Sequence, residues 1–271
     1  MVLVMTVAAV PAFATDVSPW DNDTRSAVRL IGASAVRESA GPVLRGGVEI
    51  KLQPGWKTYW RYPGDAGVPP VFDFTESDNV KSVTVQWPAP VRFADGGGNS
   101  IGYKNAVIFP LRVVPQDAAK PVMLRLKLDY AVCDKLCIPA KGKADLLLSK
   151  SAGSQDAALK TAEARVPKVQ AIGGGGALTI RKAWRDNASG KPQIVVEVAA
   201  TPGTEVDLFA EGPTPDWALP LPSPVAGAAA GSKRFAFELD GLPSGAKPEG
   251  ASVKLTATAG SEAVEAVFRL D

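Results

Sequence analysis

Two cysteines, Cys133 and Cys137, are the only residues of this chain with thiol chemistry. The three residues between them allow the two Cβ atoms to come within bonding distance if the segment bends. Such a pair can exchange disulfides with another protein, or it can form a permanent structural bridge. A bridge that closes so small a loop removes little chain entropy and therefore adds little stability. From these residues alone, both interpretations stay open.

The neighbours of the pair do not decide between them. The spacing differs from the C-x-x-C at a helix N-terminus, and Lys135 favours a thiolate whereas Asp134 opposes it. Two thiolates can also bind Cu(I), because soft sulfur ligands select that ion. Outside the first fourteen residues, Met123 is the only thioether, so a copper site at Cys133 and Cys137 has few ligands. We expect no metal and no other cofactor.

Histidine is absent from the chain, which excludes several classes of function. Without imidazole there is no Ser-His-Asp or Cys-His catalytic group. The commonest ligand of zinc and copper(II) sites is also missing. The formal net charge is only +2 and the basic residues are scattered, with no basic stripe interleaved with aromatic residues. We therefore expect no binding to nucleic acid.

Residues 1–14 form a short apolar run that ends in Ala12-Phe13-Ala14, the small-x-small pattern of a secretory cleavage site. We expect this segment to be a signal peptide. Because the positively charged region of a signal peptide is missing, we expect the true start of the protein to lie upstream of Met1. No later segment approaches eighteen uninterrupted apolar residues, so we expect no membrane insertion of the mature chain. Export to the periplasm would place the cysteines where a disulfide persists.

Period-two alternation of apolar and polar residues dominates the rest of the chain and predicts strands with one buried face. With 26 Gly and 23 Pro between these runs, the pattern is typical of antiparallel β-sandwiches. The cysteine pair follows one such strand, 124–130, and precedes another at 144–148. The Pro-rich stretch 212–225, which contains Trp217, is expected to be a surface loop.

One segment, from 155 to about 166, lacks Gly and Pro and predicts a short helix with Ser154 as its N-cap. A run of four glycines at 173–176 follows and marks a domain boundary. We therefore predict an all-β chain: a redox β-sandwich over 15–170, a linker over 171–176, and a second, smaller β-sandwich over 177–271, with one short helix between them.

Several motifs resemble the N-terminal domain of DsbD-type thiol:disulfide interchange proteins, in particular the branch that includes the copper-sensitivity suppressor ScsB. They occur in order over residues 25–150: WKTYWRYPGDAGVPP at 56–70, WPAP at 87–90, Gly102-Tyr103, YAVC at 130–133 and CIP at 137–139. The resemblance implies an immunoglobulin-like sandwich in which Cys133 and Cys137 are the reactive pair. It also implies a loop with aromatic residues that covers the disulfide, here within 93–103, so Phe93, Tyr103 and Tyr130 are candidates for cover or partner contact.

The resemblance further implies a periplasmic thiol-disulfide interchange module that passes electrons to or from thioredoxin-like proteins. The electron donor would be a separate membrane protein, because the sequence shows neither transmembrane helices nor a thioredoxin domain of its own. Whether the chain acts as a protein-disulfide reductase is therefore left open. The alternative is a non-catalytic binding or accessory module, related to copper tolerance, with a structural disulfide.

Overall fold

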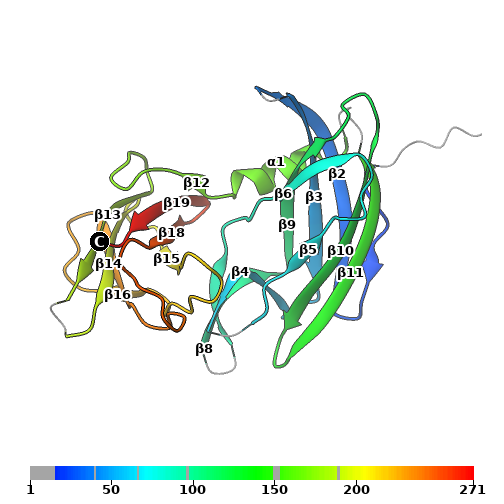
Figure 1. Ribbon diagram of the computed structural model, residues 1–271. Helices are drawn as coiled ribbons and strands as arrows, with labels where there is room; N and C mark the ends of the chain where they lie inside the picture. The colour runs from blue at the N-terminus through cyan, green and yellow to red at the C-terminus, as the bar shows by residue number, and fades with distance from the viewer. Residues whose placement is uncertain (1–15, 40, 66, 96–97, 149–152, 188–189) are drawn as a thin grey trace, which may run out of the picture.

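Strands between Asp21 and Leu148 form two β-sheets that face each other (Figure 1). The computed structural model describes residues 16–39, 41–65, 67–95, 98–148, 153–187 and 190–271. The predicted signal peptide thus lies outside the described residues. The first sheet contains β1 (Asp21–Asn22), β2 (Ser26–Glu38), β3 (Gly41–Leu52), β9 (Ala106–Pro115) and β6 (Val80–Val85), in that order. The second contains β11 (Cys137–Leu148), β10 (Val122–Cys133), β4 (Lys57–Gly64), β8 (Gly98–Lys104) and β7 (Val91–Asp95), with β5 (Val71–Asp73) also paired to β10.

The core of this sandwich follows directly from the alternation in the sequence. Val48 and Ile50 of β3 and Leu124 and Leu128 of β10 point between the sheets and are almost completely buried. Fully burying a side chain of this size stabilises the fold by about 1.5–3 kcal/mol. Glu49, between the two buried residues of β3, points to the other face and is ion-paired with Arg29. The period-two pattern therefore fixes which face of each strand is apolar.

A second sandwich follows α1 (Asp156–Ala164), and it appears on the left in Figure 1. One sheet contains β12 (Lys168–Val169), β19 (Glu262–Arg269), β18 (Ser252–Ala259) and β15 (Val206–Glu211). The other contains β13 (Thr179–Asp186), β14 (Gln193–Ala199), β17 (Ser232–Glu238) and β16 (Ser223–Val225). Among the described strand pairs of this sandwich, only β12 with β19 is parallel, and the others are antiparallel. This architecture confirms the predicted all-β class with two sandwiches and one short helix between them, whereas the boundaries at 170 and 177 stay a prediction.

Within the Pro-rich segment 212–225, residues 212–222 contain no helix or strand, as the predicted loop requires, but some of its side chains are not at the surface. Trp217 is only 5% exposed and Leu219 only 3%, and both pack in the core of the second sandwich. Gly212 makes room for the indole, because a Cβ at that position would lie 2.2 Å from Cβ of Trp217. The prediction was wrong here because it took proline content as a sign of exposure, while burying an indole ring is strongly favourable.

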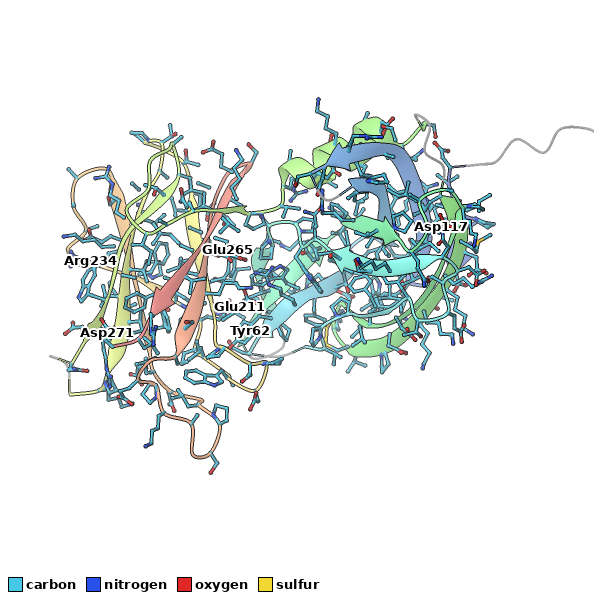
Figure 2. The ribbon with its side chains drawn as sticks, turned by 45° about the horizontal axis from the view of Figure 1, so that its top comes forward. Tyr62, Asp117, Glu211, Arg234, Glu265 and Asp271 are labelled. Carbon is cyan, nitrogen blue, oxygen red and sulfur yellow. A yellow bond between two sulfur atoms is a disulfide. The ribbon has the colours of Figure 1, made fainter. Side chains whose placement is uncertain are left out.

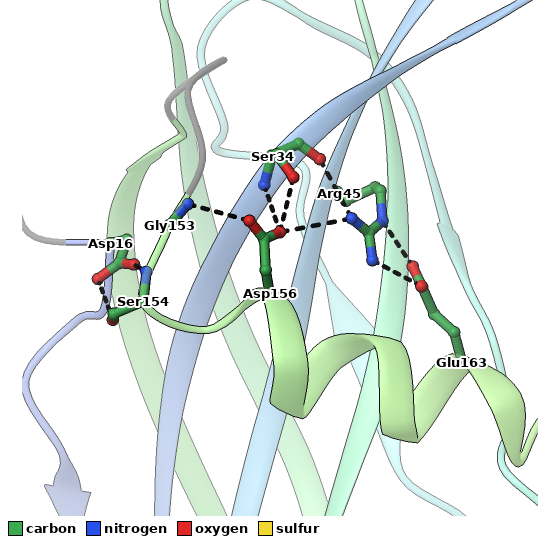
Figure 3. Close-up of polar contacts among 7 residues, drawn as sticks. All are labelled: Asp16, Ser34, Arg45, Gly153, Ser154, Asp156 and Glu163. Carbon is green, nitrogen blue, oxygen red and sulfur yellow. Dashed lines mark hydrogen bonds and ion pairs between the residues drawn. The ribbon is translucent and has the colours of Figure 1, made fainter.

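Helix α1 lies against the first sandwich and is held there by charged groups (Figure 3). Arg45 donates hydrogen bonds of 2.8 and 2.6 Å to the two carboxylate oxygens of Glu163. Asp156, in the first turn, accepts hydrogen bonds from the backbone N–H and the hydroxyl of Ser34. The predicted N-cap Ser154 does not cap the helix, because its hydroxyl donates to Asp16 instead. The helix begins one residue later than predicted and ends at Ala164.

The second sandwich closes the core of the first. Phe209 of β15 is fully buried within the core of the first sandwich, and its ring centroid lies 5.9 Å from that of Trp60 in β4. Arg61, the next residue of β4, donates to both oxygens of Glu211 at 2.8 and 2.7 Å and to Glu265 at 2.5 Å. These contacts join the two sandwiches through an apolar centre and an adjacent charged group.

Tyr62 extends this contact along the same strand. Its hydroxyl donates a 2.6 Å hydrogen bond to the carbonyl of Leu219. Burial, together with the charges of Asp65 and Glu211, raises the pKa of Tyr62 to about 12, so this hydroxyl stays protonated as a donor. Figure 2 shows Tyr62, Glu211 and Glu265 where the two sandwiches meet.

Candidate functional site

The two cysteines end the two strands of one hairpin. In the antiparallel pairing of β10 with β11, Cys133 and Cys137 are the last register pair, and residues 134–136 form the turn. Their Cα atoms lie 4.1 Å apart and a disulfide joins them. The sequence placed the pair at a strand end, and the structure adds that both cysteines are themselves strand residues. The hairpin therefore fixes the positions of both sulfur atoms.

The disulfide lies on the outer face of the second sheet. Tyr130 and Val132 of β10 point into the sandwich core, whereas Ala131 and Cys133 point away from it. Tyr59 of β4 and Phe93 of β7 pack with these two residues, and we call Tyr59, Phe93, Ala131 and Cys133 the disulfide cluster. All four side chains in the cluster are at most 5% exposed. The cluster thus gives Cys133 an apolar, water-poor environment.

The two cysteines differ sharply in accessibility. Cys133 is 1% exposed, while Cys137 is an exposed residue at the start of β11. Disulfide exchange requires a thiolate to approach a sulfur atom, and access is one of the factors that set its rate. Cys137 is therefore the cysteine that another protein can reach.

Tyr59 contacts the exposed cysteine directly. Its hydroxyl oxygen lies 2.8 Å from Sγ of Cys137, and in the disulfide the sulfur accepts while the hydroxyl donates. The ring of Tyr59 is covered by Gly67, which has φ +126°. A Cβ on Gly67 would lie 2.4 Å from Cε1 of Tyr59, so no other residue fits at that position without displacing the ring. Gly67 thus packs against the ring whose hydroxyl contacts the disulfide.

Two lysines lie beside Phe93. The ammonium groups of Lys57 and Lys104 are 5.2 and 5.8 Å from the centre of its ring, which is the range of cation–π contacts. Lys57 is also the register partner of Cys133 across the β10–β4 pairing. Two positive charges therefore lie against Phe93, the aromatic ring of the disulfide cluster.

The structure separates the other proposed cover residues from the disulfide cluster. The ring of Tyr103 lies in the core of the first sandwich, and its hydroxyl donates to the carbonyl of Pro88 at 2.9 Å. Tyr130 also faces that core, and its hydroxyl is 2.7 Å from the hydroxyl of Ser26. Burial raises the pKa of both tyrosines. Of the three candidates, only Phe93 belongs to the disulfide cluster.

Sequence reasoning did not assign a role to Tyr59 or Lys57, although both lie in the 56–70 motif. The alternation in this motif places Tyr59 and Trp60 on opposite faces of the strand. What the sequence does not give is the pairing of β4 with β10, which brings Tyr59 and Lys57 beside the disulfide. Among the residues that the structure describes, no group of three or more Cys, Asp or Glu side chains is arranged to hold a metal ion.

Comparisons with known proteins follow the first sandwich closely and extend over the second. Residues 33–149 match the family described as "Thiol:disulfide interchange protein DsbD, N-terminal". Among solved structures, the chain is similar to the N-terminal periplasmic domain of ScsB from Proteus mirabilis, with a TM-score of 0.72 and 21% identity. That similarity covers 95% of this chain and 99% of the other. No curated protein matches the chain.

Proposed function

Because residues 33–149 of this chain match the family of DsbD N-terminal domains, we propose that the protein exchanges disulfides with partner thiol proteins through Cys133 and Cys137. The observation that carries the proposal is the asymmetry of the disulfide: Cys137 is exposed, while Cys133 is buried under aromatic side chains. A purely structural bridge needs no such difference between its two ends. The β-hairpin provides a rigid support for the pair, and the reaction needs no cofactor.

The exchange begins at Cys137. A thiolate of the partner attacks Sγ of Cys137, a new sulfur–sulfur bond forms, and the Cys133–Cys137 bond breaks with both bonding electrons going to Cys133. The Cys133 thiolate then takes up a proton from water. A second thiolate on the partner attacks the mixed disulfide, which oxidises the partner to a disulfide and releases Cys137 as a thiolate. Two electrons have then passed from the partner to this chain.

The reverse reaction passes the same two electrons to an oxidised acceptor. In the reduced protein, Cys137 is the exposed thiol and Tyr59 is placed to donate a hydrogen bond to its thiolate, as it does to the disulfide sulfur. Hydrogen bonds to an ionised partner are roughly twice as strong as neutral ones, so Tyr59 favours the thiolate. Cys137 then attacks the acceptor disulfide and Cys133 resolves the mixed disulfide.

Phe93 and Tyr59 limit access to the buried cysteine. Their rings pack with Cys133, so a small thiol in solution meets an obstructed sulfur on that side. On the other side of the pair, Leu136 in the turn is 74% exposed and offers an apolar contact to a partner. Small thiols can still reach the exposed Cys137, and the apolar contact at Leu136 is available only to a larger partner such as a protein.

The partners we propose are thioredoxin-like proteins and a separate membrane electron donor, in the periplasm. The similar ScsB structure is a periplasmic domain, which supports this location. Among the described residues, no helix is long and apolar enough to cross a membrane.

The test is the reduction potential of the Cys133–Cys137 couple, measured by glutathione redox titration. A potential of roughly −120 to −270 mV, the range of exchange-active couples, supports the proposal. A potential below about −300 mV would mean a structural bridge and would leave a binding or accessory role, such as one in copper tolerance, as the function. Cys133→Ser should trap partners as stable mixed disulfides on Cys137, whereas Cys137→Ser should trap far fewer because Cys133 is buried.

A further inference from the structure

Three outward-facing residues lie in one row across the second sheet. Cys133 of β10 is paired with Lys57 of β4, and Lys57 is paired with Lys104 of β8. Directly opposite residues in antiparallel strands have Cβ atoms about 4.5–5.5 Å apart. The two lysines therefore extend from the disulfide across two neighbouring strands, and we call Lys57 and Lys104 the lysine row.

Both ammonium groups of the lysine row lie against Phe93 and carry no ion pair among the described residues. The carboxylates described on the surrounding elements are engaged elsewhere or lie in the hairpin turn. Asp129 is paired with Lys141 at 2.9 Å, and Asp65, which accepts a hydrogen bond from the backbone N–H of Asn99, follows the end of β4 opposite to Lys57. Asp134, in the turn beside Lys135, is exposed. Lys57, Lys104 and Lys135 thus outnumber Asp134 beside the disulfide, which gives the described surface there an excess of positive charge.

We propose that the lysine row is a docking surface for a partner thiol protein with acidic side chains around its reactive cysteine. This inference rests on the proposed exchange function and names the chemistry of the partner's surface. A partner that approaches Cys137 passes over Phe93, where carboxylates can pair with Lys57 and Lys104. Complementary charge mainly speeds association and selects among partners, rather than adding much affinity. Lys57 has a second effect, because it lies beside the cysteine that leaves as a thiolate.

The test compares two dithiol peptides that reduce the disulfide of the full chain. The acidic peptide is Glu-Cys-Gly-Pro-Cys-Glu and the neutral one is Gln-Cys-Gly-Pro-Cys-Gln, both blocked at their ends. Acid quenching and mass spectrometry give the rate constant of each. At about 0.01 M salt the screening length is about 30 Å, and at about 1 M it is about 3 Å, so the two conditions separate electrostatic from other effects.

At low salt we expect the acidic peptide to react about three- to tenfold faster than the neutral one, at or just below the lower end of known electrostatic rate enhancements. This ratio should fall to about one at high salt, where exposed charges are screened. It should also fall to about one in Lys57→Gln/Lys104→Gln at low salt. The ratio is the useful measure, because any loss of thiolate stabilisation by Lys57 slows both peptides equally.

The control variant, Lys51→Gln/Lys81→Gln, removes the same net charge from exposed lysines of the first sheet and should keep the ratio. A ratio of one in the unmodified protein, or an unchanged ratio in the lysine-row variant, would overturn the docking surface while leaving exchange intact. If neither peptide reduces the disulfide, the docking surface is overturned as a route for acidic thiols; if the reduction potential of the couple also lies below about −300 mV, the exchange function itself is wrong.

Discussion

Tyr59 and Trp60 are adjacent in β4, yet their side chains serve opposite faces of the second sheet. Tyr59 reaches Sγ of Cys137 on the outer face, and Trp60 packs against Phe209 of the second sandwich on the inner face. The strand that supports the disulfide therefore also carries the contact between the two sandwiches. Each side of this strand leads to a separate prediction.

We expect Tyr59→Phe to make the reduction potential of the cysteine couple more negative by about 30 mV. The hydrogen bond from Tyr59 stabilises the thiolate more than the disulfide sulfur, by about 1.5 kcal/mol. For a two-electron couple, about 1.4 kcal/mol corresponds to about 30 mV. Tyr130→Phe is the matched control, since its hydroxyl lies on the core face beside Ser26 and its loss should leave the potential unchanged. A positive shift of the potential, or no shift, would show that Tyr59 does not stabilise the Cys137 thiolate.

Phe93→Ala should speed reduction of the disulfide by a small neutral dithiol such as dithiothreitol. Each exposed cation–π contact is worth about 0.5–1 kcal/mol. Loss of both contacts to Phe93 therefore corresponds to roughly a five- to thirtyfold faster rate, if they hold the ring over Cys133. Tyr103→Phe, which changes only the core, should have no effect on this rate. Equal rates in Phe93→Ala and the unmodified protein would show that Phe93 does not cover the disulfide.

Phe209→Ala should destabilise the first sandwich, although residue 209 belongs to the second. Removing a fully buried phenylalanine ring costs about 3–5 kcal/mol, and here the cavity opens beside Trp60. Hydrogen exchange of the amides in β4 and β8 measures the effect. Phe237→Ala, in the core of the second sandwich, is the comparison and should leave those amides more protected than Phe209→Ala does. Equal protection in the two variants would contradict the shared core.

Asp156 should make the free energy of unfolding depend on pH in the acidic range. Hydrogen bonds from the hydroxyl and backbone N–H of Ser34 lower its pKa below the ordinary value of 3.8. A carboxyl group with a lower pKa in the folded state stabilises the fold above its unfolded pKa, and this contribution is lost as pH falls through the folded pKa. Asp156→Asn should therefore show a smaller loss of stability between about pH 5 and pH 3 than the unmodified protein. Urea denaturation across this pH range measures the free energy of unfolding. An unchanged pH dependence in Asp156→Asn would show that Asp156 does not contribute to the loss of stability in acid.

The sequence by itself determined the all-β class, the short helix and the position of the cysteine pair at a strand end. These features depend on local patterns: alternation every two residues, a Gly- and Pro-free segment, and two cysteines three residues apart. The resemblance to the family could also be read from the sequence, because the motifs at 56–70 and 130–139 each consist of consecutive or nearly consecutive residues. The period-two alternation of a strand also places the neighbouring residues Tyr59 and Trp60 on opposite faces.

Only the tertiary structure decided which aromatic residue lies at the disulfide and how the sandwiches join. Phe93 and Tyr103 are aromatic residues of the neighbouring strands β7 and β8, but strand pairing turns Phe93 to the outer face of the sheet and Tyr103 into the core. The burial of Trp217 and the insertion of Phe209 into the other sandwich depend on contacts between residues far apart in the chain. Such contacts arise from strand order and register, which are set by the packing of the whole molecule and leave no local pattern in the sequence.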